Sequence, residues 1–424
     1  MTLRRSPRVV LGALEGVALV AAAGIGLAAV VHAHLVSSSP ADGEALETPP
    51  AAVRLVFSEP IEAGLSRIVL VSARDSIVAR VHADSADVNA LIGELPRLAA
   101  AGYRVDWRVV SADGHPVEGS FAFTVLAPPG ADTVRPVAPP PPSAHPAGHA
   151  HAGPNVPAGV SAVFRGLAMF SLLVWTGWLI QLVALGGAPV GARRAAVALA
   201  ATTTVLLAAH AAAWLWHVAP AGRPDVAGAL GTGPGRVEAL RVGLALLGLW
   251  AIGLARRPWI ALAIALAAVL ASGATGHSAG ISPRWSIPIK SLHLIAIAVW
   301  TGGVAWLAVA ALEPAAFRES TARVSGLALG AVAVVGLTGI AQAALFLPGL
   351  DALWGSAYGR LVLAKAAGLA GLVGCGAFNR RRLIPRLAAD GDPSALRRST
   401  RRELALMLLV SLLAGVLAYV PPQS

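Results

Sequence analysis

The chain has 424 residues, of which 56% are hydrophobic and only 13% are charged. Soluble domains carry about 25% charged residues, so this composition excludes an ordinary soluble enzyme and indicates a chain that lies mostly in a membrane. The net charge of +11 does not indicate nucleic-acid binding, because the basic residues stand between apolar spans. One cysteine, Cys375, excludes an intrachain disulfide, and three methionines are too few for a Met-rich metal site, which leaves the 11 histidines as the main ligand supply.

The first 31 residues combine a basic start with an apolar run. Arg4, Arg5 and Arg8 precede the run that extends from residue 9 to residue 31. This order is typical of a secretory signal peptide, and the run is also just long enough to remain as a membrane-spanning anchor. We therefore expect residues 1–31 to be either a cleaved signal or a retained helix.

Residues 32–126 differ from the rest of the chain because charge returns and short alternating runs lie between turn residues. In the run 103–110, Tyr103 and Trp107 fall on one face while Arg104 and Arg108 fall on the other, which is the period of a half-buried strand. The same reasoning predicts strands at 53–57, 67–73, 77–83, 103–110 and 120–125. Several short strands in one segment predict a small soluble sandwich or barrel.

Residues 127–158 are rich in proline, alanine and glycine and have no apolar periodicity. Such a composition predicts an extended, semi-rigid linker. The linker carries His145, His149 and His151. Two interpretations stay open: these histidines pass a metal ion between the flanking domains, or they belong to a solvated spacer with no such role.

The segment 159–424 is predicted to be an all-α bundle of eight transmembrane helices. The apolar spans lie near 162–187, 195–217, 238–255, 258–275, 290–312, 324–347, 360–378 and 403–420. If the soluble domain is outside, the Arg-rich segment 379–402 and the pair Arg193–Arg194 fall inside, as the positive-inside rule requires. We expect a multi-pass protein of the inner (cytoplasmic) membrane, with its N-terminal domain and C-terminus on the periplasmic side.

Two patches of the soluble segment contain metal-ligand types: HAHLVSSSPADGE at 32–44 and WRVVSADGHPVEGSFAFTV at 107–125. In the second patch, Asp113 and His115 flank a glycine and present a carboxylate beside an imidazole. A histidine at a processed N-terminus would add an amine and a second imidazole, and such a nitrogen-rich set favours Cu(II). A lone Asp-Gly-His segment is more often simply a turn, so that interpretation also stays open.

The two patches together resemble CopC, a family of small periplasmic copper-binding domains. The matching positions are His32, Leu35, Ser38, Pro40 and Gly43 in the first patch, and Ser111, Asp113, Gly114, His115, Gly119, Phe121, Phe123 and Val125 in the second. The resemblance implies an all-β Greek-key sandwich of cupredoxin or immunoglobulin-like type, with a Cu(II) site made of His32, Asp113 and His115. Signal cleavage after Ala33 would instead expose His34, because Ala33 is the small residue that cleavage favours.

Histidines also lie in or at the ends of the apolar spans. His210 is inside the second span, His217 is at its outer end, His277 closes the fourth span and His293 opens the fifth. Ionisable groups are costly inside a bilayer and are therefore candidate functional residues. Histidine and tryptophan at helix ends are also common simply as interfacial residues.

The membrane segment resembles CopD, a family of copper-transport membrane proteins often fused to CopC. The matching positions in 276–307, 337–347 and 358–385 are His277, His293, Trp300, Gly302, Gly303, Thr338, Gly339, Tyr358, Gly359, Arg360, Lys365, Asn379 and Pro385. The resemblance implies a copper vestibule that includes His277 and His293. We add His210, because of its depth in the second span, and His217 at the outer end of the same span. Lys365 is expected to face a partner or a cavity.

These observations predict a non-enzymatic protein that binds copper outside the membrane and translocates it. The cargo is Cu(II), with Cu(I) as the alternative state, and the partners are the lipid bilayer and periplasmic copper donor or acceptor proteins, with no nucleic acid. No nucleotide-binding motif such as GxxxxGK[ST] is present, so transport would be passive or ion-coupled. The alternatives are a membrane electron-transfer or copper-reducing protein that uses haem, and a copper-sequestering tolerance factor without transport.

Overall fold

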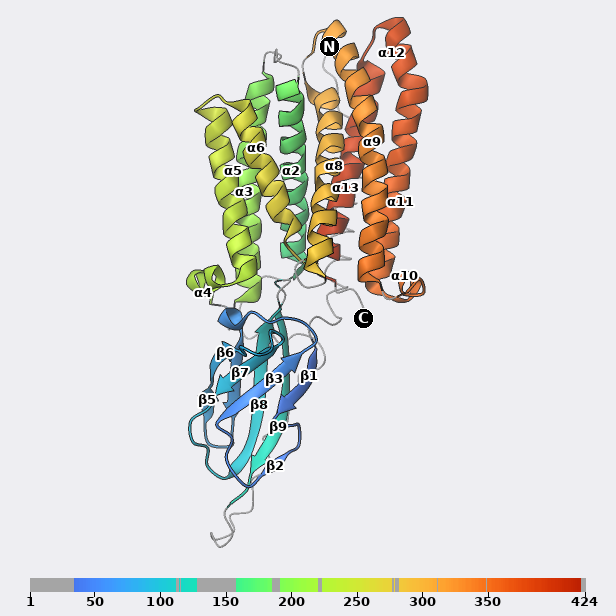
Figure 1. Cartoon of the computed structure of the whole chain (residues 1–424). Helices are drawn as coiled ribbons and strands as arrows, with labels where there is room; N and C mark the ends of the chain where they lie inside the picture. Colours follow the sequence, from blue (N-terminus) through green and yellow to red (C-terminus); the bar gives the residue numbers. More distant parts are fainter. Residues whose placement is uncertain are drawn as a thin grey trace, which may run out of the picture. The chain divides into compact units, whose positions relative to one another are not determined.

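The computed structural model divides the chain into two compact units, each described here by itself (Figure 1). The sandwich unit takes its residues from Ala29–Val156 and Trp214–Arg236, and the helical unit takes its residues mainly from Pro157–Ala213 and Val237–Ser424. The structure describes residues 34–111, 114, 116–127, 158–184, 191–219, 223–276, 278, 282–310, 312–347 and 349–420. The expected signal or anchor at 1–31 and most of the linker at 127–158 lie outside these residues.

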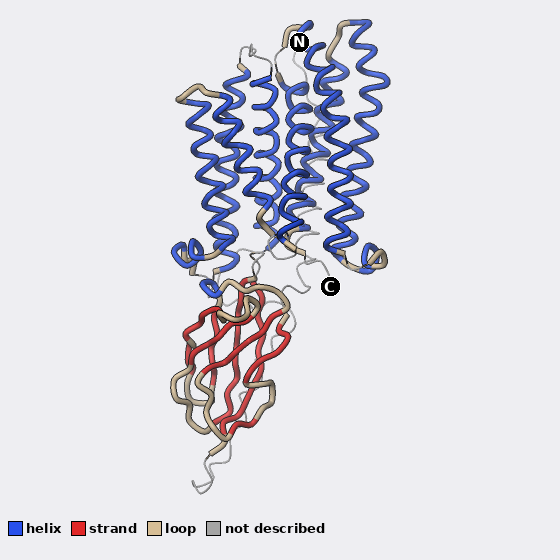
Figure 2. Tube along the Cα trace, in the orientation of Figure 1, coloured by secondary structure: helices blue, strands red, loops and turns tan. Residues whose placement is uncertain are grey.

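The sandwich unit contains two β-sheets, which Figure 2 shows as the strand-rich part of the chain. The first sheet has the order β1-β3-β7-β6, with β1 at Leu35–Ser39, β3 at Ala52–Phe57, β7 at Ala90–Glu94 and β6 at Arg80–Ala83. The second has the order β2-β9-β8-β4-β5, with β2 at Ala45–Leu46, β9 at Pro116–Val125, β8 at Ala101–Val110, β4 at Arg67–Val71 and β5 at Ser76–Val78. A short 3-10 turn, η1, covers Ala63–Leu65.

Strand β8 confirms the alternation expected from the sequence. Tyr103, Val105, Trp107 and Val109 are all buried and belong to one hydrophobic core. The strand is central, since it pairs antiparallel with both β4 and β9. Across the core, the rings of Phe57 and Trp107 meet edge to face with their centroids 5.2 Å apart.

The run 77–83 differs from the single strand that its sequence predicts. It divides at Ala79 into β5 of one sheet and β6 of the other, and the Ala79 side chain is buried at the break. A period-2 pattern shows which residues are extended but contains no information on which sheet they join. Strand β1 was not expected, because its sequence LVSSS lacks apolar alternation.

The helical unit consists of long helices and a few short ones. The long helices are α2 (Ala158–Ala184), α3 (Ala192–Val218), α5 (Gly233–Gly253), α6 (Pro258–Gly273), α8 (Pro283–Val309), α9 (Pro314–Phe346), α11 (Ala357–Phe378) and α13 (Ser394–Leu417). The short ones are α4 (Val226–Gly231), which belongs to the sandwich unit, α10 (Ala352–Gly355) and α12 (Ile384–Asp390), which continues α11 through a π-helical turn at Asn379–Leu383. Helix α2 packs against α6, α8 and α13.

Among the described helices, five are long and apolar enough to cross a membrane. They are α2, α3, α8, α9 and the continuous segment Ala357–Asp390. Helix α6 is shorter, while α5 and α13 carry charged residues within their length. The expected count of eight spans therefore stays a prediction.

Glycines let α2 approach two neighbouring helices closely. At Gly177, an added Cβ would collide with the backbone of α8 at Ala298 and Gly302. At Gly166, it would press against the backbone of α13 at Leu412. Small residues permit such close backbone contact between apolar helices, so these crossings fix where α8 and α13 lie against α2.

The start of α8 corrects one expectation. The span was expected to begin near residue 290, whereas the helix begins at Pro283 and places Lys290 two turns inside it. Proline is favoured at the first helical position because its missing N–H needs no partner there. The first turns of α8 contain polar residues, so the apolar run begins later than the helix does.

Candidate functional site

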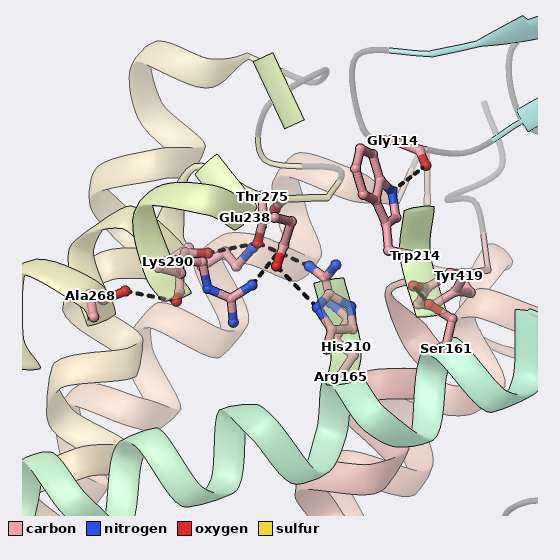
Figure 3. A network of polar contacts seen from close by, with 12 residues as sticks. Gly114, Ser161, Arg165, His210, Trp214, Glu238, Ala268, Thr275, Lys290 and Tyr419 are labelled. Atoms are coloured by element: carbon pink, nitrogen blue, oxygen red, sulfur yellow. Dashed lines mark hydrogen bonds and ion pairs between the residues drawn. The ribbon is translucent and has the colours of Figure 1, made fainter. Parts of the chain in front are cut away.

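The three predicted Cu(II) ligands of the sandwich unit, His32, Asp113 and His115, lie outside the described residues. Gly114, between the latter two in sequence, is described and has a φ of +89°, a conformation that suits glycine. Its N–H donates to the Ser111 carbonyl at 2.8 Å, and its own carbonyl accepts a bond from the Trp214 indole at 3.0 Å (Figure 3). The backbone at the centre of the motif is therefore fixed from both sides.

Polar contacts connect residues 214–236 to the strands of the sandwich unit, to which they belong. The Arg108 guanidinium donates to the backbone carbonyls of His217, Val218 and Ala219 at 3.1, 3.2 and 2.7 Å. These are the last carbonyls of a helix, which a cation stabilises. Burial lowers the pKa of Arg108.

Glu62 makes a second contact of this kind within the unit. Its carboxylate accepts the Gly233 N–H at 3.1 Å, at the start of α5. Burial is the larger effect and raises the pKa of Glu62, while the Gly233 bond opposes it.

His34, the residue that signal cleavage after Ala33 would expose as the first one, is exposed, and its N–H donates to Ser58 Oγ at 3.1 Å.

In the helical unit, His210 is the centre of a buried ionic group. The side chain is 0% exposed, and its Nδ1 lies 3.1 Å from Glu238 Oε2. The other Glu238 oxygen accepts from Arg241 Nη1 at 2.7 Å. Figure 3 shows His210 and Glu238 pointing toward one another from α3 and α5. His210 Nε2 has no hydrogen-bond partner among the residues that the structure describes.

Sequence reasoning missed Glu238 and Arg241, the partners of His210. Their signal is an acid and a base one helical turn apart at the start of an apolar run. Both residues lie at the start of the expected span 238–255, and neither was named as a candidate. A buried charge needs a partner, so the burial of His210 and Arg241 depends on this carboxylate.

His293 lies on the wall of a cavity of about 390 Å³, here called the His293 cavity. Its walls come from α2, α8, α9, α11 and α13. The Thr338 hydroxyl donates to the Val334 carbonyl at 2.6 Å and lies 2.8 Å from His293 Nδ1. Because that hydroxyl has one proton, it accepts from Nδ1–H, which leaves a lone pair on Nε2 of the neutral ring. A lone pair on Nε2 is what a metal ion requires.

Both internal methionines, Met169 and Met407, line this cavity together with His293. Two methionines do not make a Met-rich site, but they place two thioether groups in the lining of one cavity. The two residues come from α2 and α13, which are distant in sequence and packed in space. Lys365 also lines the cavity, as its depth in the span led us to expect.

A second cavity of about 540 Å³, the Glu403 cavity, lies on the other side of a shared wall. Trp300 and Leu372 line both cavities. The Trp300 indole hydrogen bonds to the Glu403 carboxylate, which also accepts from Asn379 Nδ2 at 3.1 Å. The side chain of Trp300 is thereby fixed between the two spaces.

The described part of the chain contains no group of three or more His, Cys, Asp or Glu side chains that could hold a metal ion. His277 lies outside that part. His210 and His293 are held by different partners, the first by Glu238 and the second beside Thr338. The grouping of His210, His217, His277 and His293 into one vestibule thus stays a prediction.

Comparison with protein-family models identifies two segments of the chain. Residues 35–126 match the CopC domain, and residues 318–417 match copper resistance protein D. The second match covers α9 through α13 and begins beyond His277 and His293.

Known proteins resemble the chain over different lengths. Copper transport protein CutJ of Bacillus subtilis is 27% identical and aligns with 92% of this chain and 74% of its own. Copper resistance protein C of Xanthomonas campestris pv. juglandis is 38% identical over 26% of this chain and 91% of its own. The crystal structure of CopC from Methylosinus trichosporium OB3b is 31% identical, covers 22% of this chain and 94% of its own, and gives a TM-score of 0.21. The chain belongs to the CopC family through residues 35–126, and it is a multi-pass membrane protein whose helical region contains a segment that matches copper resistance protein D.

Proposed function

We propose that this protein binds copper outside the inner membrane and moves it through the helical unit toward the cytoplasm. The observation that carries the proposal is the pair of cavities that share Trp300 and Leu372 as a wall. Two cavities separated by shared side chains suit stepwise passage of a small cargo. The CutJ relative, a copper transport protein, supports copper as that cargo.

The first station in this proposal is the CopC domain. His32, Asp113 and His115 would bind Cu(II) there, because amine, imidazole and carboxylate donors suit that ion. The bond between Gly114 and Trp214 supports a fixed position for this motif within the sandwich unit. The linker histidines His145, His149 and His151 remain candidates for the transfer step.

The second station is the His293 cavity. The free lone pair of His293 Nε2 and the thioethers of Met169 and Met407 offer one imidazole and two soft donors to the same space. Thioether sulfur favours Cu(I), so these donors suit copper in that oxidation state. Neither donor type needs to lose a proton at neutral pH, and the site would therefore bind copper without releasing one.

Copper uptake by liposomes that contain the purified full-length protein tests the proposal. We expect His293→Ala, alone and with His277→Ala, to lower the initial rate of uptake at least tenfold. His82→Ala, which removes an exposed histidine from β6, is the matched control and should leave the rate unchanged. Copper that binds the wild type stoichiometrically but never enters the liposomes would contradict transport. A haem band in the reduced-minus-oxidised spectrum of the same preparation would favour electron transfer instead.

A further inference from the structure

Glu403 is a buried carboxylate near the start of α13. Its side chain is only 3% exposed, and it accepts hydrogen bonds from the Trp300 indole of α8 and from Asn379 Nδ2, the latter at 3.1 Å. The Ser399 hydroxyl donates to Asn379 Oδ1, which fixes the amide with its nitrogen toward Glu403. No ion pair joins Glu403 to any residue that the structure describes. Neutral donors therefore hold this carboxylate.

The cations on the helices around Glu403 have other positions and partners. On the same helix, Arg397 and Arg401 donate to backbone carbonyls at the end of α8, at 2.9 and 3.2 Å, and Arg402 is exposed. Across the Trp300 wall, the other cavity is lined by Arg165 of α2, Lys290 and His293 of α8 and Lys365 of α11. Protonation of Glu403 would thus break no ion pair among the described residues.

The Glu403 cavity connects the buried carboxylate with exposed side chains. Its lining includes Arg380 and Arg381, both exposed, in the π-helical turn after α11, and α9 adds the hydroxyls of Thr321 and Ser325. At about 540 Å³ it has room for several waters, because one water occupies about 30 Å³. The positive-inside rule predicts that the two arginines lie on the cytoplasmic side, so protons would reach Glu403 from there.

The protonation state of Glu403 decides how firmly Trp300 is held. A hydrogen bond to an ionised carboxylate is roughly twice as strong as one between neutral groups. Burial disfavours the ionised form, whereas the bonds donated by Trp300 and Asn379 favour it, so the two effects oppose each other. Because Trp300 lines both cavities, a weaker bond to Glu403 loosens the wall between them.

We propose that Glu403 is a proton-binding site whose protonation from the cytoplasmic side releases Trp300 and opens the wall between the two cavities. Glu403 takes one proton from a hydronium ion in its cavity, the bond from the indole weakens, and the indole moves out of the wall. Loss of the proton restores the carboxylate and closes the wall. The proposal rests on the proposed function, because the cargo that crosses the open wall is copper. Glu403 is then a positioning residue for Trp300.

Copper uptake by liposomes with different lumenal pH tests this coupling, with the external pH and copper concentration held constant. We expect the wild type to take up copper at least fivefold faster when the lumen is one pH unit below neutrality than when it is one unit above. Glu403→Gln, which imitates the protonated side chain, should be fast at both values, whereas Glu403→Asp should keep the pH dependence. Glu319→Gln removes an exposed carboxylate of α9 and should match the wild type.

Infrared titration of the solubilised protein separates this inference from the proposed function. A carboxyl C=O band that titrates in the wild type and is missing from Glu403→Gln, in a protein that moves no copper, would leave the proton site standing and remove transport. Wild-type uptake that is equal at both lumenal pH values would overturn the coupling and leave transport standing. Loss of uptake by Glu403→Gln at both values, in a variant with the unfolding midpoint of the wild type, would also overturn it and identify the carboxylate as a copper ligand.

Discussion

At the scale of single residues, the histidines of the helical unit differ in what holds them. His210 is bound to a carboxylate and is completely buried. His293 is bound to a hydroxyl that has already donated its proton, and its ring faces a cavity. The first arrangement stabilises charge within the bundle, whereas the second leaves a nitrogen lone pair for a ligand. The sequence shows both only as histidines in apolar spans.

Replacing Glu238 by glutamine tests the role of the buried ionic group. The change removes the carboxylate that bonds both His210 and Arg241, and leaves Arg241 with no acidic partner among the described residues. Breaking such a pair costs about 3–5 kcal/mol, so the thermal unfolding midpoint in detergent should fall clearly. Glu319→Gln, which breaks an exposed pair with Arg323 on α9, should cost at most about 0.5 kcal/mol. Equal midpoints for the two variants would show that the group is not structural.

At the scale of elements, close helix crossings decide which side chains share a cavity. Gly177 and Gly302 bring α2 and α8 together, and Gly166 and Gly415 do the same for α2 and α13. These crossings bring Met169 of α2 and Met407 of α13 to the lining of one cavity. Loss of one crossing should therefore affect both packing and the cavity.

Gly177→Ala is expected to destabilise the helical unit although it adds a single methyl group. The new Cβ would collide with the backbone of α8, and inserting atoms into close packing costs about 1–3 kcal/mol. Gly243→Ala on α5 adds the same group where no atom lies within 4 Å, and should be neutral or slightly stabilising. Thermal unfolding of the two variants side by side checks this difference. A Gly177→Ala protein as stable as Gly243→Ala would show that the crossing is looser than described.

At the scale of the whole molecule, a CopC domain and a helical unit with two cavities belong to one chain. Tethering raises the local concentration of a donor domain near its acceptor, which favours transfer without release of copper to solvent. The wall formed by Trp300 and Leu372 then separates the cavity that contains His293 from the one that contains Glu403. In the proposed function, this wall prevents uncontrolled passage of copper.

Trp300→Ala should remove most of this barrier and make the protein leak. We expect faster passive entry of copper into liposomes, because the two cavities would join. Trp259→Ala, at a position of α6 that is 60% exposed, removes the same side chain away from the cavities and should behave like wild type. Unchanged uptake by Trp300→Ala, in a variant that folds normally, would argue against a route through the shared wall.

The sequence by itself determined the features that depend on neighbouring residues. Alternation in 103–110 predicted the buried face of β8, and the length of the apolar runs predicted the long helices. The motif around Gly114 predicted the CopC domain, which the family match confirms. These signals succeed because strand period, helix length and turn chemistry are local properties of a chain.

Only the tertiary structure decided which distant side chains meet. It paired His210 with Glu238, brought Met169 and Met407 to one cavity, and surrounded that cavity with Lys290, Lys365 and Arg165. It also divided 77–83 between two sheets. Such contacts depend on how helices and strands pack, and packing is set by shape and small residues across elements that the sequence separates widely.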